Sequence, residues 1–487
     1  MAKRMTEWLA SVGPITFMVI MCSGFIFAIM QLQPPFGDYG VFVSVGERLS
    51  AGDRLYAEVW DNKDPFFYYL FGIGRFFSPV GIWVVEIIRV LLFSVAIYLI
   101  SRTYSLRSQH SAFLGFFIAP IVAGALGGPI FSGLELAALV LAVSMRRHYI
   151  LGGAILGLLL FTKITLFPVA LIMFSIVLMT PSVRRCSHAA LRGLTGFCLM
   201  IISFLTLLAI RGEFVPYFDA LLSNIEYSQA LRSGSFVEGI LERIVQTFSL
   251  QAQIVFVSII SFLALSMAVK ESKKTLIPKT RGHLELAVLA GLLTALGVLA
   301  VTAQWPHHWG LLALPASLVP IIIVSRIMSP DYWQKPFPYI ALFGIAIMLA
   351  GIPQPAATLE KLLNVRGNYS AVTSMSLDGQ LIAETGGNSS YARVGQGDDS
   401  GHAFGLRDWT LSCPRFHQYW WESERVLNET LSCLDTTQVI LVAPSARDDF
   451  GTNPAWSRYL LGVEQVLKDS FSCNLTQSYQ VCHRLRS

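Results

Sequence analysis

Two charged side chains in one acidic, aromatic-rich segment are the strongest candidates for chemistry. The segment covers residues 31–80, and Asp38 and Lys63 each stand where a helix is expected to begin. Lys63 precedes Pro65, which suits the first turn of a helix, and an aromatic run follows. A lysine at a helix N-terminus, with aromatic residues beneath it, suits the phosphate of an amphiphilic substrate. Asp61, two residues earlier, belongs to the same candidate binding segment.

Asp38 is a candidate catalytic carboxylate. It follows Gly37, in the N-cap position of the expected helix, and Asp38, Phe42, Val45 and Leu49 fall on one helical face. We expect this face to lie along the membrane surface, with the carboxylate at the boundary between lipid and water. The ordinary alternatives stay open: Asp38 as a helix cap, and Lys63 as a lysine that reaches the interface along its alkyl chain.

Three further ionisable residues fall in or beside apolar stretches, where a charge is costly and therefore suggests a function. They are Arg89, Glu135 and Lys163. Each has a structural alternative: Arg89 can pair with Glu86 one turn earlier, and Lys163 can extend to the interface. Glu135 has no partner close in sequence, so a purely structural role explains it least well.

Two adjacent histidines form another candidate binding site. His307 and His308 lie between Trp305 and Trp309, before a late apolar stretch. Histidines can bind a metal or a phosphate, but neighbours on a helix point about 100° apart and rarely share one ion. A tryptophan belt at the membrane interface explains the segment equally well.

These residues must be positioned by a membrane protein with many spans. The 487 residues are 54% hydrophobic and only 14% charged, whereas a soluble domain has about a quarter charged residues. The net charge of +5 does not indicate nucleic acid, because the basic residues form short clusters between apolar stretches. We expect about eleven spans, near residues 14–32, 82–100, 111–128, 130–145, 149–164, 166–180, 193–210, 249–269, 284–302, 309–325 and 337–353.

The distribution of basic residues predicts the orientation. With the N-terminus in the cytoplasm, the cytoplasmic segments carry sixteen Lys and Arg residues and the outer loops before residue 350 carry eight. No small-residue cleavage site follows the first apolar stretch, so we expect a retained first span. An odd number of spans then places the C-terminal region outside the cytoplasm. The segment 211–247 reads as an interfacial amphipathic helix on that side, above a cavity.

The chain divides into a transmembrane catalytic domain, residues 1–353, and an extracytoplasmic domain, residues 354–487. The second is polar, and we expect a small mixed α/β fold with a buried strand at 438–442 and helices near 422–431 and 459–468. Its four cysteines are Cys413, Cys433, Cys473 and Cys482. None is in a CxxC pair, so we expect disulfides in preference to a zinc site, with the pairing open.

The order of these motifs resembles the GT-C superfamily of polytopic glycosyltransferases, especially its protein O-mannosyltransferase-like and lipid A aminoarabinose- or galacturonosyl-transferase-like branch. The resemblance covers most of the membrane region. It rests on GDYGVFVSVGERLSAGDRLY, WDNKDPFFYYLFGIGRFF, EIIRVLL, GLELAALVLAV, GLLLFTK and PHHWGLLALP, in that order.

The resemblance implies a hexosyl- or pentosyltransferase that takes a sugar from a polyprenyl-phosphate donor. The acceptor would be a hydroxyl of a lipid, glycan or protein on the extracytoplasmic face. Asp38 then corresponds to the family's base or acceptor organiser, and Lys63 to its donor-phosphate lysine. Two departures are Tyr39, where many members have a second acidic residue, and Asp64, where the family has proline. Direct attack with Asp38 as the base would invert the anomeric centre.

The other expected partners are membrane lipids, and nucleic acid is not expected. No cofactor follows with certainty, and a requirement for a divalent cation stays open. The compact size and the lack of a retention signal favour a bacterial plasma membrane. The rival functions are a transporter or flippase of a lipid-linked saccharide and an oligosaccharide polymerase or ligase. The first predicts an internal repeat, and the second predicts arginines in large late loops; the sequence has neither feature before the tail.

Overall fold

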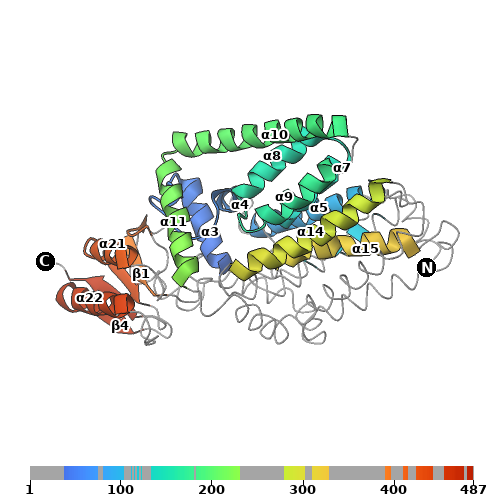
Figure 1. Cartoon of the computed structure of the whole chain (residues 1–487). Coiled ribbons are helices and arrows are strands. Elements are labelled where there is room, and N and C mark those ends of the chain that lie inside the picture. Colours follow the sequence, from blue (N-terminus) through green and yellow to red (C-terminus); the bar gives the residue numbers. More distant parts are fainter. Residues whose placement is uncertain are drawn as a thin grey trace, which may run out of the picture. The chain divides into compact units, whose positions relative to one another are not determined.

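The computed structural model is drawn in Figure 1, with its helices and strands labelled. The chain divides into two compact units. The bundle unit comprises Met1–Ile29, Val85–Phe204 and Ser233–Leu363; the loop–tail unit comprises Met30–Val84, Leu205–Arg232 and Asn364–Ser487. The residues described are 38–74, 81–103, 111, 114–115, 118–119, 122, 133–179, 183–230, 279–301, 310–327, 390–395, 410–414, 424–442, 454–475 and 480–485.

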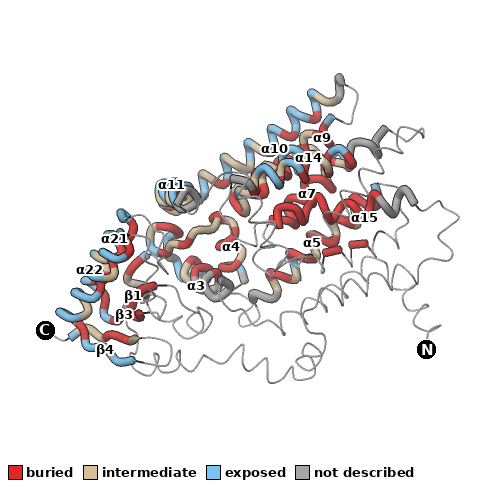
Figure 2. The backbone as a smooth tube through the Cα atoms, turned by 60° about the horizontal axis from the view of Figure 1, so that its bottom comes forward, coloured by how far each residue is buried: buried red, intermediate tan, exposed pale blue. Residues whose placement is uncertain are grey.

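The described part of the bundle unit is helical. Its helices are α5 (Gly81–Thr103), α7 (Leu134–Met145), α8 (Tyr149–Leu160), α9 (Phe167–Leu178), α10 (Val183–Ile210), α14 (Lys279–Val301) and α15 (Ala313–Ile327). The first residues of α5, up to Val84, and the last residues of α10, from Leu205, are counted in the loop–tail unit. Helix α9 packs against α7, α8 and α14, while α15 packs against α14 and α7. Buried leucine, valine and alanine side chains fill the spaces between them. Figure 2 shows α7 and most of α15 coloured as buried.

These helices fall on seven of the predicted spans. The segments 14–32, 249–269 and 337–353 lie outside the described residues, and 111–128 is described only at scattered positions. Helix α10 begins at Val183 and not near the predicted 193, because its first turns carry arginines that are good helix formers but not apolar. The prediction of about eleven spans stays a prediction.

Two described helices are long and apolar enough to cross a membrane: Val84–Thr103 and Cys186–Ile210. Helices α7, α8 and α9 have 12 residues each and extend about 18 Å, less than the roughly 30 Å hydrocarbon core. Helix α10 exposes six large apolar side chains: Leu191, Leu194, Leu199, Ile202, Leu207 and Ile210. Such a continuous apolar surface suits contact with lipid better than contact with water.

Helices α8 and α10 approach closely at glycines. A Cβ atom built on Gly153 would lie 1.8 Å from the carbonyl oxygen of Gly193, and one on Gly196 would lie 1.9 Å from that of Ile150. Small residues allow this approach of two backbones, as is common between membrane helices. The glycines therefore set the distance between α8 and α10.

We expect Gly153→Ala to destabilise the protein by about 1–3 kcal/mol, because the new methyl group must displace the backbone of α10. The matched control is Gly297→Ala in α14, where a Cβ atom meets nothing within 4 Å. Thermal unfolding in detergent would measure both variants. An unchanged midpoint for Gly153→Ala would contradict the close packing.

In the loop–tail unit, helix α3 (Asp38–Ala51) packs against helix α4 (Pro65–Gly74). The predicted face of α3 is buried, with Phe42, Val45 and Leu49 at most 6% exposed. The Phe42 ring centroid lies 4.6 Å from that of Phe67. The expectation that this face lies on the membrane surface is therefore wrong: the aromatic residues of α4 cover it. The start of α4 at Pro65 is as predicted.

The tail contains a five-stranded sheet in the order β2-β1-β3-β5-β4. The strands are β1 (Ser390–Val394), β2 (Thr410–Leu411), β3 (Val439–Val442), β4 (Phe471–Leu475) and β5 (Gln480–Arg484). Strand β1 is parallel to β2 and β3, whereas β5 is antiparallel to β3 and β4. The predicted strand at 438–442 is β3, whose four residues are all buried.

Two helices accompany this sheet, α21 (Glu424–Leu434) and α22 (Pro454–Ser470), at the two predicted helical segments. Their buried side chains, among them Leu427, Trp456 and Tyr459, form one hydrophobic core with strands β1, β3 and β5. The domain division at residue 353 stays a prediction, and the loop–tail unit also contains residues 38–74.

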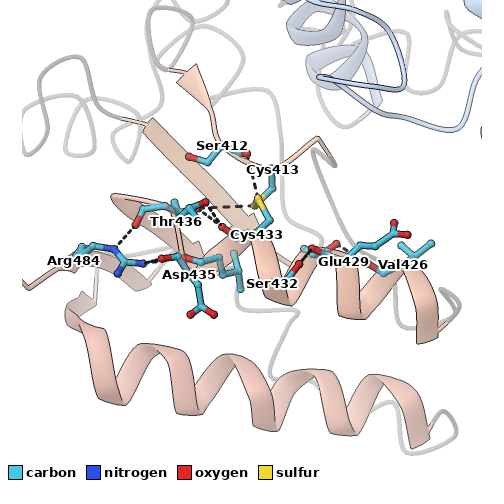
Figure 3. Close-up of a disulfide and its surroundings, with 12 residues drawn as sticks. Ser412, Cys413, Val426, Glu429, Ser432, Cys433, Asp435, Thr436 and Arg484 are labelled. Atoms are coloured by element: carbon cyan, nitrogen blue, oxygen red, sulfur yellow. Dashed lines mark hydrogen bonds between the residues drawn. A yellow bond between two sulfur atoms is a disulfide. The ribbon is translucent and has the colours of Figure 1, made fainter. Parts of the chain in front are cut away.

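All four tail cysteines form disulfides. Cys413, after β2, pairs with Cys433 of α21 (Figure 3), and Cys473 of β4 pairs with Cys482 of β5. The second bond joins residues that face each other in the antiparallel register. The two bonds thus differ in purpose: one connects a loop to a helix, and the other connects strands that are already paired.

Candidate active site

The short segment Trp60 to Asp64, here called the lysine loop, is held by tyrosine hydroxyls. Tyr68 in α4 donates a hydrogen bond to Oδ2 of Asp61 at 2.6 Å and accepts one from the main-chain N–H of Lys63 at 3.2 Å. Tyr56 donates to the main-chain carbonyl of Lys63 at 2.5 Å. The backbone of Lys63 is therefore fixed on both sides.

Asp61 shapes this loop. Its carboxylate is 3% exposed, and its second oxygen, Oδ1, accepts a hydrogen bond from the N–H of Asn62 at 2.7 Å. Each carboxylate oxygen thus has a donor within the protein, an arrangement that orders a loop. A direct contact of Asp61 with substrate stays a prediction.

The lysine side chain extends from this rigid base. Nζ of Lys63 donates to Oδ1 of Asn62 at 2.8 Å and lies 5.9 Å from the ring centroid of Phe42. An ammonium over an aromatic face is held electrostatically without losing its charge. Asp38 is the first residue of α3, one helical turn before Phe42. The Asp38 side chain lies outside the described part.

Asp64 is the acidic departure from the family pattern, and it is turned inward. It is 9% exposed. Burial raises the pKa of Tyr56 and of Tyr217, and the charge of Asp64 raises both further. The two hydroxyls therefore stay protonated in this region. Asp64 is thus a buried carboxylate whose charge acts on these two tyrosine hydroxyls.

Glu213 connects the segment that contains Leu55 and Tyr69 to the start of helix α11 (Phe214–Ala230). It is 0% exposed, and its Oε1 accepts hydrogen bonds from the N–H of Leu55 at 2.9 Å and from Nε of Arg211 at 2.8 Å. The Tyr69 hydroxyl donates to Oε2. The sequence analysis missed Glu213, and no local signal marks it, because two of its three partners lie 144 and 158 residues away.

Helix α11 supports the lysine loop with one face. Asn224 donates from Nδ2 to the carbonyl of Asn62 at 3.0 Å, and Tyr217 is buried at 6.0 Å from the ring of Tyr56. The other face exposes Phe214, Val215, Phe218, Leu222 and Ile225. This division between a loop-facing side and an exposed apolar side suits a helix in the membrane interface.

The bundle unit holds a second group of buried charges. Nε of Arg89 in α5 lies 3.1 Å from Oε1 of Glu135 in α7, and its Nη1 contacts Glu86. All three residues are at most 4% exposed. The expected pair of Arg89 with Glu86 is thus present, and Glu135 finds its partner 46 residues away.

Lys163 follows α8 and lies near this group. A Cβ atom on Gly133, two residues before Glu135, would come within 2.9 Å of Cβ of Lys163. The structure therefore brings the chain around Lys163 close to the start of α7. His307 and His308 lie outside the described residues. The binding roles of all these residues stay predictions.

We expect Arg89→Met to destabilise the protein by about 3–5 kcal/mol, because it leaves two buried carboxylates without their common cation. Arg54→Met is the control, since Arg54 pairs with Glu58 on the surface and its loss should cost less than about 1 kcal/mol. Detergent melting curves would separate the two variants. Equal losses would show that the buried group contributes nothing special to stability.

Among the residues that the structure describes, no three His, Cys, Asp or Glu side chains gather in a way that could hold a metal ion. A requirement for a divalent cation therefore stays open. The chemistry available in the described part of the lysine loop is that of a fixed ammonium, buried carboxylates and protonated tyrosine hydroxyls.

Comparison with known proteins finds likeness in structure only. No protein-family model and no curated protein sequence matches the chain. Its structure is similar to ArnT from Cupriavidus metallidurans bound to undecaprenyl phosphate, with 14% identity, a TM-score of 0.58 and 99% of each chain covered. It is also similar to arabinofuranosyltransferase AftD from Mycobacteria, with 12% identity, a TM-score of 0.50, and 97% of this chain and 40% of that chain covered.

Proposed function

We propose that this chain, which has the GT-C glycosyltransferase fold, moves a sugar from a polyprenyl-phosphate donor to an acceptor hydroxyl. The observation that carries the proposal is the fixed position of Lys63. Its backbone is held by Tyr56 and Tyr68, and its ammonium lies over Phe42, one turn after Asp38. The ammonium of Lys63 and the first residue of α3, the candidate base Asp38, thus belong to the same compact unit.

The proposed reaction is a direct transfer of the sugar in one step. The acceptor oxygen forms a bond to the anomeric carbon while the bond from that carbon to the phosphate oxygen breaks. Asp38 takes the hydroxyl proton, and Lys63 neutralises the charge that develops on the departing polyprenyl phosphate. Attack from the face opposite the phosphate inverts the anomeric centre. Tyrosine hydroxyls keep the lysine loop in place during transfer.

A lipid-linked donor also fits helix α11. Its exposed apolar face would enter the interface, and its other face contacts the lysine loop through Asn224. The prenyl chain would then remain in lipid while the phosphate reaches Lys63. The likeness to a protein bound to undecaprenyl phosphate supports this donor class.

The finer features of the proposal come from the sequence. They are about eleven spans, a cytoplasmic N-terminus, a tail outside the cytoplasm and a bacterial plasma membrane. The disulfides of the tail support the outer location, because such bonds persist in oxidising compartments. Substrate-binding roles of Arg89, Glu135 and Lys163 in the bundle unit are likewise proposed from the sequence.

Sugar transfer from a panel of radiolabelled polyprenyl-phosphate hexoses and pentoses tests the proposal. Membranes with the protein are expected to transfer label from at least one donor to lipid, glycan or protein, and membranes without it are not. If no donor supports transfer, and the purified protein instead moves lipid-linked saccharide across proteoliposomes, the transporter hypothesis replaces this one. Growth of the product by whole oligosaccharide units would indicate a polymerase or ligase.

A further inference from the structure

The tail contacts the lysine loop directly. The main-chain N–H of Trp60 donates a hydrogen bond to the carbonyl of Pro414 at 2.6 Å. Trp60 precedes Asp61 and stands three residues before Lys63. Tyr56, Tyr68 and α11 hold the later residues of the loop, so this contact fixes its beginning.

Pro414 is itself fixed by its neighbours. Cys413, the preceding residue, is 1% exposed and forms the disulfide with Cys433 (Figure 3). Ser412 donates its N–H to the carbonyl of Tyr391 in β1 at 2.7 Å. The segment after β2 is therefore attached to the sheet by a hydrogen bond and to α21 by a covalent bond.

The end of α21 is anchored in turn. Arg484 of β5 donates from Nε to the carbonyl of Thr437 at 2.8 Å and from Nη2 to that of Leu434 at 3.3 Å. The Thr436 hydroxyl donates to the carbonyl of Cys433 at 2.9 Å. These bonds satisfy carbonyls at the helix C-terminus and give Cys433 a defined position (Figure 3). Because the disulfide joins Cys433 to Cys413, it also restrains the neighbouring Pro414.

A second contact also links the tail to the residues that support the lysine loop. Nη2 of Arg425 in α21 lies 3.5 Å from Oγ of Ser223 in α11. Ser223 adjoins Asn224, which holds the carbonyl of Asn62. The contact is exposed and weak, but it joins the tail to the same support of the lysine loop.

We propose that the tail is a positioning part of the donor site, and that the Cys413–Cys433 disulfide sets the lysine loop through the carbonyl of Pro414. This inference rests on the proposed function for its effect on transfer, but not for the contact itself. Cys413 and Cys433 are positioning residues, since they act on Lys63 through Pro414 and Trp60. The other disulfide, Cys473–Cys482, joins paired strands and serves as the matched control.

Hydrogen exchange of the Trp60 amide tests the contact without an activity assay. In full-length protein in detergent, Cys413→Ala/Cys433→Ala is expected to speed this exchange about fivefold, the factor for one net hydrogen bond. Cys473→Ala/Cys482→Ala is expected to leave it unchanged. Donor KM is expected to rise about tenfold in the first variant only, because small displacements of binding groups are costly. Equal exchange in the two variants would overturn the proposal.

A crosslinked variant covers the case in which the first variant folds poorly. Trp60→Cys and Pro414→Cys, added to Cys413→Ala/Cys433→Ala, are expected to form a new disulfide that mass spectrometry detects and to bring donor KM back toward the wild-type value. Failure of residues 60 and 414 to crosslink would overturn the proposal. If wild-type protein transfers no sugar, the proposed function fails, whereas the exchange and crosslinking results still decide the contact.

Discussion

Replacement of Asp38 by Asn is expected to lower sugar transfer by about 10²- to 10⁴-fold, the range for loss of a positioned general base. The amide keeps the size and the capping ability of the carboxylate but cannot take the proton of the acceptor hydroxyl. Helix α3 should therefore remain intact, with Phe42 and Val45 packed against α4. The initial rate at saturating donor measures the effect.

Glu58, a carboxylate between helices α3 and α4, provides the control for this result. Glu58 is exposed and pairs with Arg54, so Glu58→Gln removes one negative charge near the site without touching the proposed chemistry. Transfer by Glu58→Gln should stay within a factor of about two, since such pairs contribute little. Asp38→Glu should keep part of the activity, because a base is retained but displaced. Wild-type rates for Asp38→Asn would reduce Asp38 to a helix cap.

Local features of the first loop could be predicted from the sequence because their causes are local. Proline at position 65 fits the first turn of a helix, and α4 begins there. The helical spacing of Phe42, Val45 and Leu49 predicted one apolar face of α3, and these three side chains are buried. The partner of that face could not be predicted in this way. An apolar stripe beside a membrane can pack on lipid or on protein, and here α4 supplies the protein.

In the candidate site, too, contacts between residues close in sequence could be predicted and contacts between distant segments could not. Lys63 was recognisable by its place before a helix, and Arg89 with Glu86 by their spacing of three residues. The bond from Arg89 to Glu135 and the bonds of Glu213 to Leu55 and Tyr69 connect segments far apart in the chain. Such contacts follow from the packing of several helices and leave no periodic pattern in either segment.

In the tail, a strand could be predicted from the sequence, but the disulfide pairing could not. The apolar run at 438–442 predicted β3, because a short buried strand needs such residues on both faces. Four cysteines, however, allow three pairings, and their spacing did not select one. The packing of α21 against the strands decides it. Cys433 faces the end of β2, and this places Pro414 against Trp60.

Replacement of Lys63 by Met is expected to lower kcat/KM for the donor about 10²- to 10³-fold, the cost of removing one group that stabilises developing charge. Methionine matches the length and apolar stem of lysine, so contact with Phe42 is preserved while the ammonium is lost. The loop should keep its shape, because Tyr56 and Tyr68 hold the main chain of Lys63 and not its side chain. Unchanged exchange at Trp60 together with the lost rate would separate the loss of charge from the loss of structure.

Lys63→Arg and Lys468→Met complete this experiment. Arginine keeps the charge but spreads it over a planar group, so it should restore only part of the rate. Lys468 is exposed on α22, and its replacement controls for the loss of one positive charge. A lysine that merely reaches toward the interface would tolerate methionine and arginine equally, with no change in donor KM. A phosphate ligand would instead give the order Lys, Arg, Met, because the rate then depends on a cation at the end of that side chain.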